Sequence, residues 1–222
     1  MKFNREFANQ IIDDLINCVD TASKEIMQIY NSDNFETSDK ADGSPLTLAD
    51  KASNQIITEG LKKITPDIAV ISEETFEDTI LKALPNLYWL VDPLDGTREF
   101  INKNDEFTVN IALIEDRKPV FGIVAAPVFE KCWHGSIFDN YHSDKSIPDV
   151  LRIVMSKSHK SDNDKSFLNF LNEKGVNYEI IEKGSSLKLC AIADNEADIY
   201  PRFGPTSCLL YTSDAADDTS RG

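Results

Sequence analysis

Four acidic side chains stand where apolar segments of the chain end: Asp50, Glu73, Asp92 and Asp95. Carboxylate oxygens suit a hard divalent cation, and magnesium commonly shares such a site with the phosphate of a substrate. Acidic residues at the ends of neighbouring buried elements can converge on one point. The pattern therefore predicts a site for metal-assisted phosphate chemistry.

The segment Asp92–Thr97 concentrates this candidate chemistry in the sequence Asp-Pro-Leu-Asp-Gly-Thr. Its proline fixes the backbone, so both aspartates can turn towards a common point with the Leu94 carbonyl between them. Its glycine allows a close approach of the backbone. Thr97 could begin a helical turn whose free N–H groups face a phosphate. Because the same residues also suit an ordinary turn, the motif alone leaves a purely structural role open.

The other acidic positions have structural interpretations as well. Asp50 follows Thr47 by three residues, which predicts a capping box with Asp in place of Glu. That role is compatible with a catalytic one. Glu73, beside Glu74, could be solvated charge at the end of a strand.

The apolar pattern predicts the elements that position these residues. Apolar residues spaced by three or four predict helices over residues 4–30 and 47–63, separated by a polar loop over 31–44. Two short apolar runs, 68–71 and 88–91, predict buried strands.

The second half of the chain continues the mixture of strands and helices. Alternating apolar residues over 106–138 predict an antiparallel meander, and the polar stretch 139–149 predicts a boundary. Beyond it we predict strands over 151–155, 176–181 and 197–203 and helices over 162–174 and 186–193. Such a succession favours a layered α/β architecture.

Composition narrows the classes of partner. The 222 residues are 41% hydrophobic and 27% charged, as expected for a globular enzyme, and carry a net charge of −15. This charge disfavours nucleic-acid polymers and anionic membranes as partners. The four cysteines form no Cys-x-x-Cys pair, so we expect no zinc site. The N-terminal sequence resembles neither a signal peptide nor a transmembrane helix, and we expect a cytoplasmic location.

Three segments in order, residues 42–50, 71–74 and 89–97, resemble the inositol monophosphatase superfamily. The resemblance extends from residue 1 to about Ser207. It implies the layered αβαβα sandwich of the inositol monophosphatase and fructose-1,6-bisphosphatase type, here incomplete at its C-terminal end. It also implies an N-terminal domain at 1–140 with the metal and catalytic motifs, and a partial C-terminal domain at 141–207 on the substrate side.

Further segments are similar to the bacterial bisphosphate nucleotidases of the CysQ type; they are residues 98–100, 104–114, 184–188 and 200–206. This similarity implies removal of the 3'-phosphate from adenosine 3',5'-bisphosphate, a by-product of sulfur metabolism, and action on the sulfated form in some members. It also implies inhibition by lithium, a monomer or homodimer, and a cytoplasmic enzyme that can associate peripherally with the inner membrane.

The resemblance assigns roles to individual residues. Asp50 and Thr97 would orient or deprotonate the attacking water. Glu73, Asp92, Asp95 and the Leu94 carbonyl would hold two or three magnesium ions. The implied substrate-binding residues are Glu73, Leu94, Asp95, Gly96, Thr97, Ser186, Lys188 and Arg202. Among these, the last two would face the second phosphate of the nucleotide.

The sequence departs from the family near its end. The family continues after Gly-Pro-Thr-Ser to a Trp-Asp pair whose aspartate is a metal ligand, whereas Leu210 stands in that position here. We interpret residues 208–222 as a non-native tail. The loss of one carboxylate would weaken a metal site.

Two alternatives to a nucleotidase stay open. The same chemistry could act on inositol phosphates or sugar phosphates. The chain could also be a catalytically impaired fragment that binds phosphate or metal, which the residue at position 210 suggests.

Overall fold

The computed structural model describes residues 2–32, 37–39, 45–75, 84–139, 148–157 and 161–203. They fall into two compact units, one within Met1–Asp139 and the other within Asn140–Thr206. Each unit has a sheet and apolar clusters of its own. None of the helices in the described part is both long enough and apolar enough to cross a membrane.

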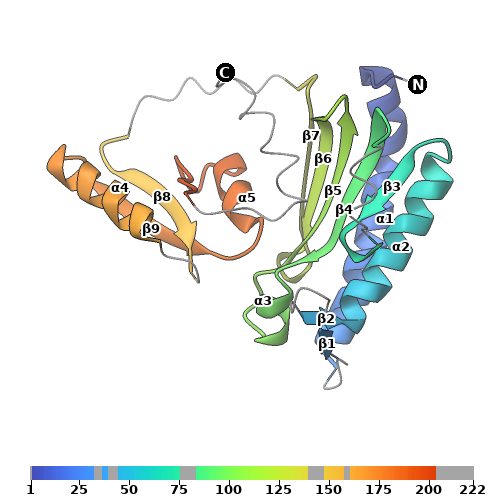
Figure 1. Ribbon diagram of the computed structural model, residues 1–222, viewed down its shortest axis with the longest axis horizontal. Coiled ribbons are helices and arrows are strands. Elements are labelled where there is room, and N and C mark those ends of the chain that lie inside the picture. Colours follow the sequence, from blue (N-terminus) through green and yellow to red (C-terminus); the bar gives the residue numbers. More distant parts are fainter. Residues whose placement is uncertain are drawn as a thin grey trace. The chain divides into compact units, whose positions relative to one another are not determined.

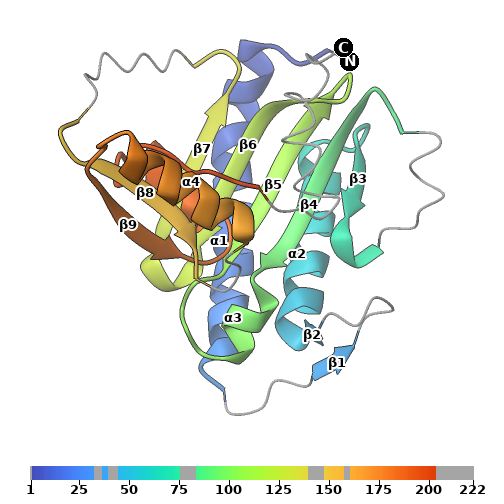
Figure 2. The ribbon, with the colours of Figure 1, turned by 60° about the vertical axis from the view of Figure 1, so that its left-hand side comes forward.

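Two long helices cover one face of the first unit's sheet (Figures 1 and 2). They are α1 (Arg5–Tyr30) and α2 (Leu48–Ile64), and they confirm the helices predicted over 4–30 and 47–63. Asn4 caps α1 by accepting the Phe7 amide at 2.8 Å. The buried residues of α1 recur every three or four positions, so one side of the helix faces the core.

The sheet of the first unit has five strands in the order β3-β4-β5-β6-β7. β3 pairs with β4 in parallel, and the other neighbours are antiparallel, which confirms the predicted meander. Large buried side chains such as Trp89, Leu113 and Leu15 fill the space between this sheet and the helices. The bounds are β3 (Ala69–Ser72), β4 (Leu87–Asp95), β5 (Thr108–Glu115), β6 (Lys118–Ala126) and β7 (Lys131–Ser136).

The Asp92–Asp95 segment differs from its prediction. We expected a strand that ends at Val91 and a turn after it, but β4 runs on to Asp95. The pairing with β5 shifts register between the two aspartates. Pro93 lies inside this shift and has no N–H to donate to a ladder, so a bulge accommodates it. The segment is therefore a bulged strand end that is fixed to the sheet.

The predicted loop over 31–44 is wrong for residues 37–39. There, β1 (Thr37–Asp39) pairs antiparallel with β2 (Pro45–Thr47), directly before α2. Three polar residues carry no alternating apolar signal, so backbone pairing alone defines this strand. The rest of that stretch after Ser32, up to residue 44, lies outside the described residues.

The second unit contains a βαβ motif. β8 (Leu151–Ser156) and β9 (Tyr178–Lys183) are parallel neighbours, α4 (Asp162–Glu173) connects them, and α5 (Leu187–Ala193) follows β9. β9 begins two residues later than predicted, because Gly175 adopts a left-handed φ of 67° and the Val176 amide bonds back to α4.

The strand predicted over 197–203 is also wrong. The structure has only a single bridge there, between Ile199 and Ile153 of β8. Pro201 stands two residues after Ile199 and has no N–H to donate to a ladder, which explains why pairing stops. Arg152 holds the preceding residues, with an ion pair to Asp198 at 2.7 Å and a bond to the Asn195 carbonyl.

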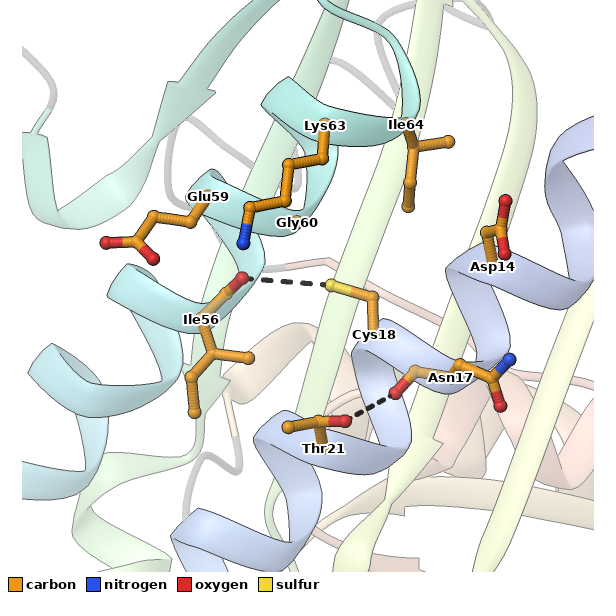
Figure 3. Close-up of a pocket in the computed structure, with 9 residues that line it drawn as sticks. All are labelled: Asp14, Asn17, Cys18, Thr21, Ile56, Glu59, Gly60, Lys63 and Ile64. Atoms are coloured by element: carbon orange, nitrogen blue, oxygen red, sulfur yellow. Dashed lines mark hydrogen bonds between the residues drawn. The ribbon is translucent and has the colours of Figure 1, made fainter.

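The two long helices pack closely at one point (Figure 3). A Cβ added to Gly60 of α2 would lie only 2.4 Å from the Cys18 Sγ of α1. The thiol lies 3.8 Å from the Ile56 carbonyl oxygen. Burial raises the pKa of Cys18, and the charge of Lys63 opposes that shift. The thiol therefore acts as a packing group in the groove between the helices.

Candidate active site

Asp50 is fixed by the start of its own helix. The Thr47 backbone N–H and the Thr47 Oγ1 hydroxyl donate to Asp50 Oδ2 at 2.7 and 2.6 Å. Thr47 Oγ1 in turn accepts the Ala49 amide at 3.1 Å, so the predicted capping box is confirmed. Thr47 and Asp50 are fully withdrawn from solvent, at 0% and 1% exposure. Because both of these donors bind Oδ2, the Oδ1 atom of Asp50 can accept a hydrogen bond from another group.

Thr97 meets that second oxygen. Its Oγ1 lies 3.2 Å from Asp50 Oδ1 and 3.3 Å from the Leu94 carbonyl oxygen. Thr97 begins α3 (Thr97–Ile101), directly after Gly96. Gly96 has φ 94° and ψ 42°, a left-handed conformation that glycine adopts without the strain of a Cβ. Because a hydroxyl has one hydrogen, Thr97 can donate to only one of these two acceptors at a time.

Aromatic packing positions α3 and hence Thr97. The rings of Tyr30, Phe100 and Phe107 form a triangle with centroid separations of 4.9–5.2 Å. Tyr30, at the end of α1, also donates from its hydroxyl to Asp105 Oδ1 at 2.7 Å. Both phenylalanines are completely buried. The short helix is therefore attached to the core of the first unit.

The carboxyl group of Asp92, in β4, interacts with the carboxyl groups of Asp95 and Glu73. Burial is the largest cause that raises the pKa of Asp92 well above its ordinary value, although the residue as a whole is partly exposed. The charges of Asp95 and Glu73 and a hydrogen bond to Glu73 raise the pKa further, and the Leu94 amide opposes them. Negative charge is thus concentrated where a cation would relieve it.

The donor set suits magnesium in type. It consists of oxygen atoms only, from Glu73, Asp92, Asp95 and the Leu94 carbonyl. Within the described ranges, no three acidic, histidine or cysteine side chains converge tightly enough to form a preassembled metal group. Magnesium usually binds through one or two carboxylates and keeps several waters. The residues therefore fit a cation that a substrate phosphate helps to hold.

Polar side chains that the sequence analysis missed support this arrangement. Ser53 of α2 donates to the Pro93 carbonyl at 2.8 Å and ties the bulge to the helix. Thr108 Oγ1 lies 3.5 Å from Asp95 Oδ2. Ser53 and Thr108 are both buried. Each is a polar residue on an otherwise apolar face, and this pattern could have revealed them in the sequence.

Asn110 is a further polar residue beside the carboxyl groups, and it is partly buried. It lies directly opposite Asp92 in the pairing of β4 with β5. Its Oδ1 and Nδ2 atoms are buried, and neither has a hydrogen-bond partner in the described part of the chain. The polar residue interrupts an apolar stretch of β5, which marks it in the sequence.

The remaining predicted site residues belong to the second unit. Ser186 and Lys188 are buried at the start of α5, and Lys188 Nζ donates to the Ser185 carbonyl at 2.7 Å. Arg202 donates from Nη1 to the Tyr200 hydroxyl at 2.8 Å. The predicted site residues thus divide into two sets, one in each unit. Leu210 and the predicted tail at 208–222 lie outside the described residues.

Comparisons with known proteins agree with this picture. The model of the inositol monophosphatase family matches residues 8–211. A 3'(2'),5'-bisphosphate nucleotidase CysQ from Salmonella typhimurium is 42% identical over 195 residues, which cover 84% of this chain and 78% of the relative. The protein of that name from Escherichia coli K12 is 38% identical, with coverages of 89% and 82%.

Solved structures show the same relationship. The crystal structure of CysQ from Bacteroides thetaiotaomicron matches with a TM-score of 0.75 and 32% identity, over 90% of this chain and 82% of that one. The suhB protein from Bartonella henselae matches with a TM-score of 0.66 at 22% identity, over 86% and 77% of the two chains. The second match shows likeness of fold alone. The mixed α/β architecture predicted from the sequence is confirmed.

Proposed function

The chain belongs to the inositol monophosphatase family, and we propose that it is a magnesium-dependent 3'(2'),5'-bisphosphate nucleotidase. The substrate is adenosine 3',5'-bisphosphate or its sulfated form, and the products are AMP, or the sulfated nucleotide, and phosphate. Several relatives that carry the name of this enzyme share 38–42% identity with the chain over most of their length. The observation that carries the proposal is the Asp50–Thr97 contact of 3.2 Å beside three interacting carboxyl groups.

Magnesium would be held by Glu73, Asp92, Asp95 and the Leu94 carbonyl. When bound, it would lower the pKa of an attacking water and neutralise charge on the phosphate. The raised pKa of Asp92 supports this proposal, because the carboxyl group is buried near other negative charges whose repulsion a bound cation would relieve. We further propose two or three ions, inhibition by lithium and a cytoplasmic location.

Asp50 and Thr97 activate the water. Thr97 donates its hydroxyl hydrogen to Asp50 Oδ1, so the lone pairs of Thr97 Oγ1 can accept a hydrogen bond from a water molecule. The water passes its proton towards this pair while its oxygen attacks phosphorus. The bond from phosphorus to the 3'-oxygen breaks and its electron pair stays on that oxygen, which takes up a proton from solvent and leaves as the 3'-hydroxyl.

The phosphate that reacts is oriented by the backbone of Gly96 and Thr97. The left-handed Gly96 brings this backbone close to the carboxyl groups without an intervening Cβ. Lys188 and Arg202 of the second unit bind the phosphate that does not react. Arginine can contact it through two N–H groups, while lysine acts as a point charge. Ser186 adds a hydroxyl donor.

Phosphate release from adenosine 3',5'-bisphosphate tests the proposal. The reaction should require magnesium, should be inhibited by lithium, and should be lost in Asp95→Ala. Phe129→Ala, an exposed position in the 3-10 turn after β6, is a matched control and should keep full activity. Release that persists without magnesium or in Asp95→Ala would contradict the proposed site.

A further inference from the structure

Tyr200 contacts two cationic side chains of the second unit, Lys188 and Arg202. Lys188 Nζ lies 5.9 Å from the centroid of the Tyr200 ring. The hydroxyl of the same ring accepts a hydrogen bond from Arg202 Nη1 at 2.8 Å. One aromatic side chain therefore contacts an ammonium through its face and a guanidinium through its oxygen. We propose that Tyr200 is a positioning residue that orients these two cationic side chains to bind the second phosphate of the substrate, a role that rests on the proposed function.

The backbone on which Tyr200 stands is held firmly. The Ile199 carbonyl accepts the Val154 amide of β8 at 3.0 Å, directly before Tyr200. Arg152 forms an ion pair with Asp198 at 2.7 Å, at side-chain exposures of 29% and 14%. These contacts join residues 198 and 199 to the sheet of this unit. A ring attached to such a segment can define the place of side chains that are themselves flexible.

Lys188 also contacts carbonyl groups of the segment that precedes α5. Its Nζ donates to the Ser185 carbonyl at 2.7 Å and lies 3.5 Å from the Lys183 carbonyl. Ser185 adopts a left-handed φ of 52°, which is uncommon for a residue with a Cβ and indicates a loop under local constraint. Lys188 is 6% exposed. Its ammonium is therefore held by contacts with both these carbonyl oxygens and the Tyr200 ring.

Arg202 differs from Lys188 in that it is exposed. Its Nη1 donates to the Tyr200 hydroxyl, and this hydrogen bond orients the guanidinium. An arginine has many rotamers, and fixing it before a ligand arrives reduces the entropy cost of binding. Loss of the Tyr200 hydroxyl should therefore weaken the binding of an anion at Arg202 while the Lys188 ammonium keeps its ring contact.

Tyr200→Phe tests the inference because it removes only the hydroxyl. The KM for adenosine 3',5'-bisphosphate should rise about three- to tenfold, the range for the net contribution of one ordinary hydrogen bond, with little change in kcat. The KM for adenosine 3'-monophosphate, which lacks the second phosphate, should change less than about twofold. In metal-free buffer, calorimetry should show the same weakening for 5'-AMP, whose only phosphate is the second one.

Arg202→Gln and the double variant show whether Tyr200 acts through the arginine. If it does, adding Tyr200→Phe to Arg202→Gln should weaken binding of 5'-AMP no further. Tyr178→Phe removes a tyrosine hydroxyl from β9 of the same unit and serves as the matched control. Equal effects of Tyr200→Phe on both substrates, no effect on either, or additivity with Arg202→Gln would overturn the inference.

The wild-type chain separates this inference from the proposed function. If it binds 5'-AMP no better than adenosine, the assignment of a second-phosphate site fails, and the role of Tyr200 fails with it. If it prefers 5'-AMP but Tyr200→Phe leaves that preference intact, only the role of Tyr200 is refuted.

Discussion

Thr47→Val tests whether the cap of α2 also positions Asp50, the carboxylate that we propose to be catalytic. Thr47 Oγ1 donates to Asp50 Oδ2 at 2.6 Å and accepts the Ala49 amide at 3.1 Å, and valine can do neither. The Thr47 backbone N–H still donates to Asp50 at 2.7 Å. We therefore expect a folded variant in which Asp50 is held by one fewer donor.

The structure sets the size of the effect. Loss of an N-cap costs about 1 kcal/mol, and a buried carboxylate deprived of a donor costs about 1–3 kcal/mol more. For a chain of this length each kcal/mol lowers the melting temperature by about 2–4 °C, so a fall of about 4–16 °C is expected. A small displacement of Asp50 relative to Thr97 should also lower kcat by about tenfold or more.

Two further variants separate stability from catalysis. Thr47→Ser keeps the hydroxyl and should restore both melting temperature and kcat. Ser161→Ala breaks a second capping box, at the start of α4, in which Ser161 Oγ donates to Asp164 Oδ2 at 2.7 Å. It should cost about 1 kcal/mol of stability and leave kcat unchanged. Full kcat in Thr47→Val, or no rescue by serine, would refute the reasoning.

Three other predictions concern the first unit. Asp92→Asn should raise the melting temperature of the metal-free protein: the pKa of Asp92 is raised in the folded state, so its ionised form costs stability above that pKa. The increase in melting temperature should become smaller as the pH falls through the pKa of Asp92 in the folded state. An increase that does not depend on pH would contradict this reasoning. Gly60→Ala should destabilise the wild-type chain, because its Cβ would meet Cys18 Sγ at 2.4 Å, but should stabilise Cys18→Ala by about 1 kcal/mol through helix propensity. Urea unfolding of the double-mutant cycle measures the coupling, and equal effects in both backgrounds would exclude the clash. Asn110→Leu should stabilise the fold by about 1–3 kcal/mol, because it removes a buried amide without partners among the described residues. A lower urea midpoint for this variant would show that the amide is satisfied.

Periodicity predicted the first unit well where an apolar face decides the structure. The helix over 4–30 and the meander over 106–138 each bury one side against the common core, so the spacing of apolar residues carries the information. The bulge at Pro93 and the short strand β1 depend on backbone hydrogen bonds, which leave no apolar pattern. Those features could not be predicted from spacing.

The candidate site was predictable in part for a similar reason. Asp50, Glu73, Asp92 and Asp95 stand out because acidic side chains follow apolar runs. The contact of Asp50 with Thr97 joins residues 47 positions apart, and no local pattern contains it. The role proposed for Tyr200 likewise depends on side chains from different elements.

The ratio of kcat/KM for adenosine 3',5'-bisphosphate to that for inositol 1-phosphate, measured with magnesium, tests the central claim most directly. Two charge-assisted hydrogen bonds to the second phosphate, at about 1.5 kcal/mol each, predict a ratio of about 100 or more in favour of the nucleotide. A ratio at or below one would contradict the assignment as a nucleotidase and would favour an inositol phosphatase on the same fold.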